Sequence, residues 1–118
     1  MPGIPADLDL SFLRGVELTQ VCLGAWQVQF HFTPSASIAV EGNWELADEA
    51  GRIIDRSSDT MREQPFHLHL LLQRVVVGVE LSAPLSFALR FTGGLILRVF
   101  VRSDGYESFS IQPGGIFV

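Results

Sequence analysis

Apolar and polar residues alternate strictly in two stretches of the chain, residues 26–33 and 85–92. In the first stretch one side of the pattern is Trp26, Val28, Phe30 and Phe32, and the other is Gln27, Gln29, His31 and Thr33. In the second, one side is Leu85, Phe87, Leu89 and Phe91, and the other is Ser86, Ala88, Arg90 and Thr92. A period of two residues is typical of a β-strand with one buried face. The pattern therefore predicts two half-buried strands.

Turn residues divide the rest of the chain into further short strands. Thr33-Pro34-Ser35, Glu49-Ala50-Gly51, Gly93-Gly94 and Ser103-Asp104-Gly105 are sequences that favour turns. Between them the apolar runs predict eight strands, at Val16–Leu23, Ala25–Thr33, Ser37–Leu46, Arg52–Asp55, Arg74–Ser82, Leu85–Thr92, Leu95–Arg102 and Tyr106–Gln112.

The two halves of the chain resemble one another. Gly15-Val16-Glu17-Leu18-Thr19 is matched by Gly78-Val79-Glu80-Leu81-Ser82, an offset of 78 − 15 = 63. Phe32-Thr33 is matched by Phe91-Thr92, an offset of 91 − 32 = 59 that also brings the alternating positions into phase. A longer hairpin loop in the first half would account for the difference. We therefore expect an internal repeat in which residues 15–40 superpose on residues 78–99.

The segment between the halves is open to two interpretations. Thr60-Met61-Arg62-Glu63 matches a capping box, and it favours a short helix over residues 61–73. Phe66-His67-Leu68-His69-Leu70 also alternates as a strand would. The helix is preferred because Leu70-Leu71-Leu72 breaks the alternation.

These elements predict a single α+β domain, mostly β, made of two related antiparallel β-meanders with one short helix between them. The expected divisions are a lead-in at 1–13, the first meander at 15–55, the helix at 61–73 and the second meander at 74–112. The pattern leaves open whether the meanders form a sandwich, a barrel or one curved sheet.

Composition narrows the classes of function. The chain has 118 residues, a net charge of −5 and no lysine, and its arginines form no run that could follow a phosphate backbone. No apolar stretch reaches the ~18 residues of a membrane span, and no secretory signal is recognised. Cys22, the single cysteine, lies among apolar residues and reads as a packed side chain. We expect a cytoplasmic protein that binds neither nucleic acid nor membrane.

The sequence contains no recognisable catalytic constellation and implies no cofactor. No serine lies in a Gly-x-Ser-x-Gly elbow, and the glycine pairs lack the spacing of a phosphate loop. His67 and His69 could share a metal ion on a strand, with His31 as a third ligand, but not on a helix, where i and i+2 point apart. We expect no metal, and keep the three histidines as the alternative.

A protein-binding surface is the favoured site. Trp44-Glu45 and Tyr106-Glu107 are two aromatic–glutamate pairs, which offer contact area beside a charge unless the aromatics are core anchors. Ile96 and Phe100 fall on the face opposite the expected core of their strand, beside Arg98 and Arg102. Apolar side chains flanked by arginines suit an interface with a partner protein or a second copy, unless the helix covers that face.

The second half also resembles a known type of protein. Leu89-Arg90-Phe91, Gly93-Gly94, Leu97-Arg98-Val99 and Asp104-Gly105-Tyr106-Glu107-Ser108-Phe109 are similar in order to small, uncharacterised bacterial β-rich domains that end in a Tyr-Glu-Ser-aromatic strand. Glu41-Gly42-Asn43-Trp44 in the first half fits the same resemblance. Some such proteins look like immunity partners of bacterial toxins. The resemblance implies a non-catalytic, protein-binding domain, immunity-type or self-associating as a homodimer.

Overall fold

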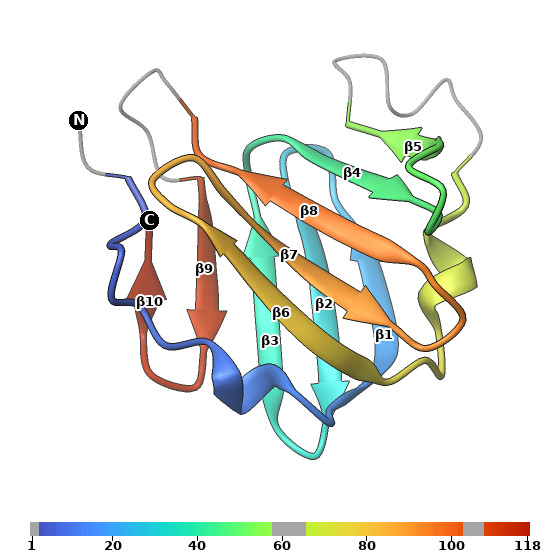
Figure 1. Cartoon of the computed structure of the whole chain (residues 1–118), viewed down its shortest axis with the longest axis horizontal. Coiled ribbons are helices and arrows are strands. Elements are labelled where there is room, and N and C mark those ends of the chain that lie inside the picture. The colour runs from blue at the N-terminus through green and yellow to red at the C-terminus, as the bar shows by residue number, and fades with distance from the viewer. Residues whose placement is uncertain (1–2, 58–65, 103–107) are drawn as a thin grey trace.

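Two antiparallel five-stranded sheets pack face to face in the computed structural model, which describes residues 3–57, 66–102 and 108–118 (Figure 1). Sheet A contains, in spatial order, β1 (Glu17–Leu23), β2 (Val28–Thr33), β3 (Ala36–Val40), β9 (Phe109–Gln112) and β10 (Ile116–Phe117). Sheet B contains β5 (Ile53–Arg56), β4 (Trp44–Ala47), β8 (Ile96–Phe100), β7 (Ser86–Phe91) and β6 (Val76–Ser82). The mostly β fold with two antiparallel meanders is confirmed, and a sandwich is the arrangement adopted.

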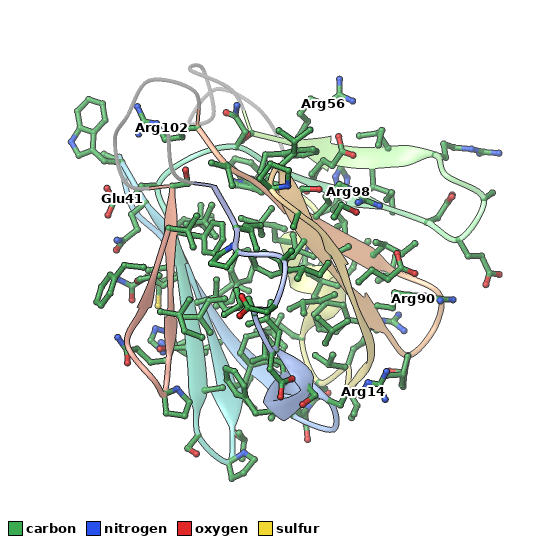
Figure 2. All side chains as sticks on the ribbon, turned by 60° about the vertical axis from the view of Figure 1, so that its left-hand side comes forward. Arg14, Glu41, Arg56, Arg90, Arg98 and Arg102 are labelled. Carbon is green, nitrogen blue, oxygen red and sulfur yellow. The ribbon has the colours of Figure 1, made fainter. Side chains whose placement is uncertain are left out.

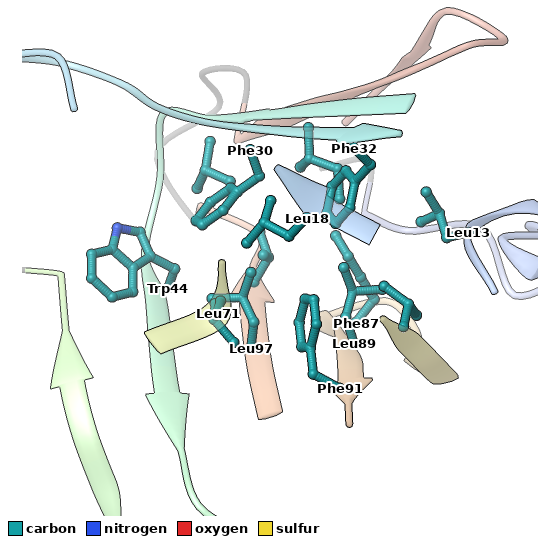
Figure 3. Packing of buried hydrophobic residues seen from close by; sticks show 14 of the residues in the cluster. Leu13, Leu18, Phe30, Phe32, Trp44, Leu71, Phe87, Leu89, Phe91 and Leu97 are labelled. Atoms are coloured by element: carbon teal, nitrogen blue, oxygen red, sulfur yellow. The ribbon is translucent and has the colours of Figure 1, made fainter. Parts of the chain in front are cut away.

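The core lies between the sheets and is built from the alternating positions. Phe30 on β2 and Leu89 on β7 are fully buried, and their apolar neighbours two residues away are at most 5% exposed (Figure 3). Phe87 and Phe109 meet across the core with ring centroids 4.9 Å apart. Trp26 and Leu85 do not follow the pattern, because β2 begins at Val28 and β7 at Ser86. Both of these side chains lie in hairpin loops and are exposed.

Each meander is completed by two strands from the other half of the chain. Strands β1–β3 lie beside β9 and β10, and strands β6–β8 lie beside β4 and β5. The chain therefore changes sheet once after β3 and once after β8. The two crossovers touch: Gly42 N donates to Ser108 O, and Phe100 N donates to Asn43 O, each at 2.9 Å. We call this end of the sandwich the crossing end.

The strand register corrects the expected alignment of the halves. Phe30 pairs with Ile38 and Leu89 pairs with Leu97, so an offset of 59 relates β2 and β3 to β7 and β8 (89 − 30 = 59; 97 − 38 = 59). The first strands follow a different offset, since the bulge after Leu18 in β1 matches the bulge after Val76 in β6 (76 − 18 = 58). The Gly-Val-Glu-Leu likeness at an offset of 63 is not a structural equivalence. The loop that is longer by one residue is in the second half.

The same offset of 58 relates the segments that lead into the two meanders. Leu10 precedes the 3₁₀ turn η1 (Ser11–Leu13) and Leu13 ends it. The residues 58 positions later, Leu68 and Leu71, are the first and last of the 3₁₀ turn η3 (Leu68–Leu71). All four leucines are buried. Each turn inserts its leucines at the margin of the core, so that the sides of the sandwich are closed in equivalent ways.

Several expected boundaries are wrong. Within the described residues the segment 66–73 holds only the 3₁₀ turn η3, and neither a longer helix nor a strand; the capping box lies outside them. The strand expected at Ser37–Leu46 is two strands, β3 and β4, because the chain changes sheet between them. The strand β10 was not expected, and the lead-in is part of the fold, with Ile4 only 3% exposed.

Candidate binding surfaces

The outer face of sheet B carries most of the residues that the sequence selected. Glu45, Ile96, Arg98 and Phe100 all point outward from this sheet and are partly exposed. Trp44 does not belong to the surface: it is 1% exposed and its ring lies 6.0 Å from that of Phe66. The alternative reading of Trp44, as an anchor of the core, is the correct one. A large aromatic side chain at an inward-facing position of an interior strand packs in the core.

Opposite charges alternate across this outer face. Cross-strand pairing places five residues in one row, in the order Glu80, Ala88, Arg98, Glu45 and Arg56. Arg56 Nη2 lies 3.4 Å from Glu45 Oε2, and Arg90 Nη1 lies 3.5 Å from Glu80 Oε1. Figure 2 shows Arg56, Arg90 and Arg98 spread along this side of the molecule. The acidic residues here have arginine neighbours within the fold, and charges of both signs are interspersed on the face.

Ile96 and Phe100 remain on this outer face without a helix over them in the described part of the chain. The turn η3 does not lie there, because Leu68 and Leu71 belong to the core and η3 contacts β1. Both side chains are nevertheless only partly exposed between the arginines. They offer a narrow apolar strip and not a broad patch.

The crossing end carries the most exposed apolar side chains. Trp26, in the loop between β1 and β2, is 89% exposed, and Leu85, in the loop between β6 and β7, is 69% exposed. These two residues are equivalent under the offset of 59 (85 − 26 = 59). Both loops lie at this end because β2 begins beside the end of β3 and β7 begins beside the end of β8. Two apolar hairpin tips thus accompany the touching crossovers.

Charged groups lie between these tips. Gln27 Nε2 donates to Glu41 Oε1 at 3.5 Å, and Val101 N donates to Leu85 O at 2.8 Å. Arg102 Nη1 donates to the backbone oxygen of Glu41 at 3.5 Å, and Figure 2 shows Arg102 and Glu41 at the same corner. Contacts therefore run from one tip to the other through Glu41 and Arg102.

A close approach of backbone and side chain fixes this corner. A Cβ atom on Gly42 would lie 2.8 Å from Arg102 Cγ, and only glycine leaves room for the arginine stem there. Arg102 N also donates to the buried Ser108 Oγ at 2.6 Å. Tyr106 and Glu107, the second expected aromatic–glutamate pair, lie outside the described residues.

The strand register identifies the residue in the second half that is structurally equivalent to Trp44. Trp44 pairs with Val99 on β8, and Phe109 pairs with Val40 on β3, the position equivalent to Val99 (99 − 40 = 59). Trp44 is therefore equivalent to Phe109, which is also buried.

The histidines occupy two separate places. His67 Nδ1 lies 2.9 Å from Asp55 Oδ1, and Asp55 Oδ2 accepts a hydrogen bond from His67 N. The ring of His69 lies 6.4 Å from that of His67, centroid to centroid. His31 is on the outer face of sheet A, with Nε2 donating to Gln29 Oε1 at 3.0 Å. In the part of the chain that is described, no three His, Cys, Asp or Glu residues form a group that could hold a metal ion.

Sequence reasoning missed the residues that now matter most at the crossing end. Trp26 and Leu85 were assigned to the core because they continue the alternation by one step. The signal that could have placed them in loops is the flanking Gly24-Ala25 and Ala83-Pro84, which are poor strand formers.

Comparisons with protein families, with curated proteins and with solved structures give no match to this chain. Among the described residues there is no helix of the length and apolarity needed to cross a membrane. The candidate surfaces are therefore identified from the geometry of this chain alone.

Proposed function

We propose that this chain is a non-catalytic protein-binding domain whose contact surface is the crossing end. The observation that carries the proposal is the exposure of Trp26, 89% at a hairpin tip, in a chain whose other tryptophan is 1% exposed. Tryptophan is strongly enriched among the residues that dominate binding energy at protein interfaces. An indole held in water has no stabilising role in the isolated domain, and a partner's pocket supplies one.

The surroundings of Trp26 suit a protein partner. Leu85 supplies a second apolar anchor, and Glu41 and Arg102 supply charges of both signs between the anchors. Interfaces commonly combine central apolar or aromatic anchors with a polar rim that sets the orientation of the partner. The expected partner is a heterologous protein, which is the immunity-type function, and self-association is the second form of the same proposal.

Expectations about origin and location accompany this function. The matching register, bulges and leading turns support a tandem duplication of a five-strand unit, β1–β5 and β6–β10. The single Cys22 and the resemblance to small bacterial domains support a bacterial, cytoplasmic protein. Like the binding function, these statements are proposals.

The test is a comparison of partner capture by matched variants. Trp26→Ala and Leu85→Ser should each abolish binding of a partner purified from the native host, or, for self-association, the concentration-dependent shift in sedimentation. Val77→Ser is the matched control, because Val77 is 58% exposed on β6, a different part of the surface. All three variants should unfold at nearly the parent temperature. Equal binding by Trp26→Ala and the parent would overturn the proposal.

Metal binding is the competing function, and one observation favours it. The carboxylate of Asp55 contacts His67 Nδ1, as carboxylates do for metal-binding histidines, and the ring of His69 lies 6.4 Å from that of His67. His31 cannot be the third ligand, and zinc sites use three or four protein ligands. Elemental analysis after purification without an affinity tag should find no stoichiometric metal. One zinc, nickel or iron per chain, lost in His67→Ala, would favour the metal site instead.

A further inference from the structure

The outer face of sheet A carries a continuous chain of side-chain hydrogen bonds along β2. Gln27 Nε2 donates to Glu41 Oε1, Gln29 Nε2 donates to Gln27 Oε1 at 2.6 Å, and His31 Nε2 donates to Gln29 Oε1 at 3.0 Å. Alternate residues of a strand share one face, so these side chains form a straight row. The bonds hold the amide planes in fixed orientations before any ligand arrives.

Shorter side chains lie next to this row. Cross-strand pairing aligns Cys22, Gln29, Ala39, Ser110 and Phe117 across all five strands. Ala39 and Ser110 stand on the two strands between Gln29 and Phe117, which is 62% exposed. Three strand spacings separate β2 from β10, which is about 14 Å at ~4.8 Å each. The small residues thus lie between amide groups on one side and an exposed aromatic ring on the other.

This face is neutral over its whole middle. The described outward residues of its central rows are Gln20, Cys22, Gln29, His31, Ser37, Ala39, Ser110, Gln112 and Phe117. None of them is Asp, Glu, Lys or Arg, and the carboxylates of Glu17 and Glu41 stand at opposite ends of the sheet. The outer face of sheet B, at equivalent positions of the fold, is instead a row of alternating charges. The two faces are therefore suited to different chemistry.

Neutrality decides which class of ligand fits. A charged ligand would be desolvated here without an opposite charge to pair with. A protein surface meets the same penalty, because charged residues make up much of it. A neutral glycan brings only hydroxyl groups and C–H faces. The amides of Gln29 and Gln112 each offer a donor and an acceptor, and serine hydroxyls offer both, which matches neighbouring hydroxyls on a sugar ring.

Phe117 supplies an aromatic ring on which the C–H face of a sugar can stack. The C–H groups of a sugar ring carry partial positive charge and pack on the negative face of an aromatic ring. Phe117 points outward from the edge strand β10, with its ring open to solvent. A ring stacked there can extend over Ser110 and Ala39 towards the ordered amides of β2.

We infer that the outer face of sheet A is a binding site for a neutral glycan, with Phe117 as the stacking platform and Gln29 as the central hydrogen-bonding group. The stacking ring of Phe117 and the amide of Gln29 lie outside the crossing end, and only the start of the row, Gln27 and Glu41, is shared with it. The inference does not depend on the protein-binding proposal. The proposal concerns binding and includes no chemical step.

The test is a nuclear magnetic resonance titration of the full chain with neutral oligosaccharides: cellohexaose, maltohexaose, xylohexaose and chitotetraose. At least one should shift the side-chain amide resonances of Gln29. Gln29→Ala and Phe117→Ala should each weaken that binding by about tenfold or more. Glu80→Ala and Arg90→Ala, on the outer face of sheet B, are the matched controls and should leave the affinity unchanged.

Three outcomes would overturn the inference. The first is that none of the four oligosaccharides shifts the Gln29 resonances at millimolar concentration. The second is that binding is unaffected by both Gln29→Ala and Phe117→Ala. The third is that sedimentation shows a dimer in which Phe117→Ala produces the monomer, since the face would then bind a second copy. Retained thermal stability of both variants ensures that lost binding is not lost folding.

Discussion

Glu17 in β1 and Val75, just before β6, face each other as an antiparallel bridge, and a shift of 58 residues maps the first position onto the second. The hydrogen bonds beside them are exchanged by the same shift. Gly15 N donates to Val76 O at 2.8 Å, and Gln73 N donates to Leu18 O at 2.7 Å. The bridge thus lies on a local twofold relation between the halves of the sandwich, where the edge strands of the two sheets meet.

This relation gives a prediction about Gln73. Gly15 has φ +88° and its equivalent, Gln73, has φ +67°, a left-handed conformation that costs a residue with a Cβ about 1–2 kcal/mol. Gln73→Gly should relieve this strain and raise the free energy of unfolding by about 0.5 kcal/mol or more, after the greater chain entropy of glycine is subtracted. Urea unfolding at equilibrium measures the change.

Gly15→Ala is the matched control for this prediction. A Cβ atom on Gly15 would meet no atom within 4 Å, so any loss must come from the backbone conformation. The free energy of unfolding should fall by about 1 kcal/mol. A loss of stability in Gln73→Gly together with no loss in Gly15→Ala would show that the left-handed φ is not the cause.

The core predicts a contrast between two phenylalanines. Phe91, at the end of β7, is 2% exposed, and Phe91→Ala should lower the free energy of unfolding by about 3–5 kcal/mol. Phe117→Ala, at a ring that is 62% exposed, should change it by only about 0.5 kcal/mol. If Phe91→Ala were as stable as the parent in urea, the inward face of β7 would be assigned incorrectly.

Alternation in the sequence was sufficient to identify β2 and β7, because strict period-two patterns result from burial of one face alone. Phe30 and Leu89 are therefore at equivalent places, as the offset of 59 indicates. The identity of Gly-Val-Glu-Leu in the two halves was misleading. That identity is one of sequence alone. The structural equivalence of β1 and β6 is defined by the positions of their bulges, which the sequence does not reveal.

The candidate surfaces were harder to predict, because they depend on which strands become neighbours. The polar side of β2 was visible in the sequence, but its contact with Ala39 and the alignment with Ser110 and Phe117 require the crossover that brings β9 beside β3. The charge row of sheet B likewise requires β4 to pair with β8. The break between β3 and β4 lies at Gly42, where the backbone closely approaches the side chain of Arg102, 60 residues later in the chain (102 − 42 = 60).

A prediction about pH concerns Asp9 at the start of η1. Hydrogen bonds from the side chain and backbone of Ser11 lower the pKa of Asp9 below its ordinary value of 3.8. The ionised carboxylate is therefore favoured in the folded state, and its contribution to stability is present above that ordinary value and is lost as the pH falls through the lower folded pKa.

Asp9→Asn tests the sign of this effect. The variant should be less stable than the parent at neutral pH, and the difference should shrink as the solution is acidified below about pH 4. Asp7→Asn is the matched control, since it removes the same charge two residues earlier and leaves the contact between Asp9 and Ser11 in place. Thermal unfolding followed across the acid range gives the measurement. A difference that grew on acidification would contradict the assignment.

The buried carboxylate of Asp55 gives the last prediction. Its side chain is 5% exposed, and its two oxygens contact the backbone nitrogen and the ring Nδ1 of His67. The contact ties β5 to the segment that enters η3, whose Leu68 and Leu71 fill the side of the core. Asp55→Ala leaves the donors of His67 without this partner, and should lower the free energy of unfolding by about 1–3 kcal/mol.

His67→Ala should lower the free energy of unfolding by less than Asp55→Ala, because the ring is 47% exposed and the backbone hydrogen bond to Asp55 would otherwise remain. Glu45→Gln breaks a surface ion pair with Arg56, so it is the matched control with an expected loss of about 0.5 kcal/mol or less. Equilibrium unfolding in urea compares the three variants, and a loss in Asp55→Ala no larger than that in Glu45→Gln would show that β5 and η3 are held together without this carboxylate.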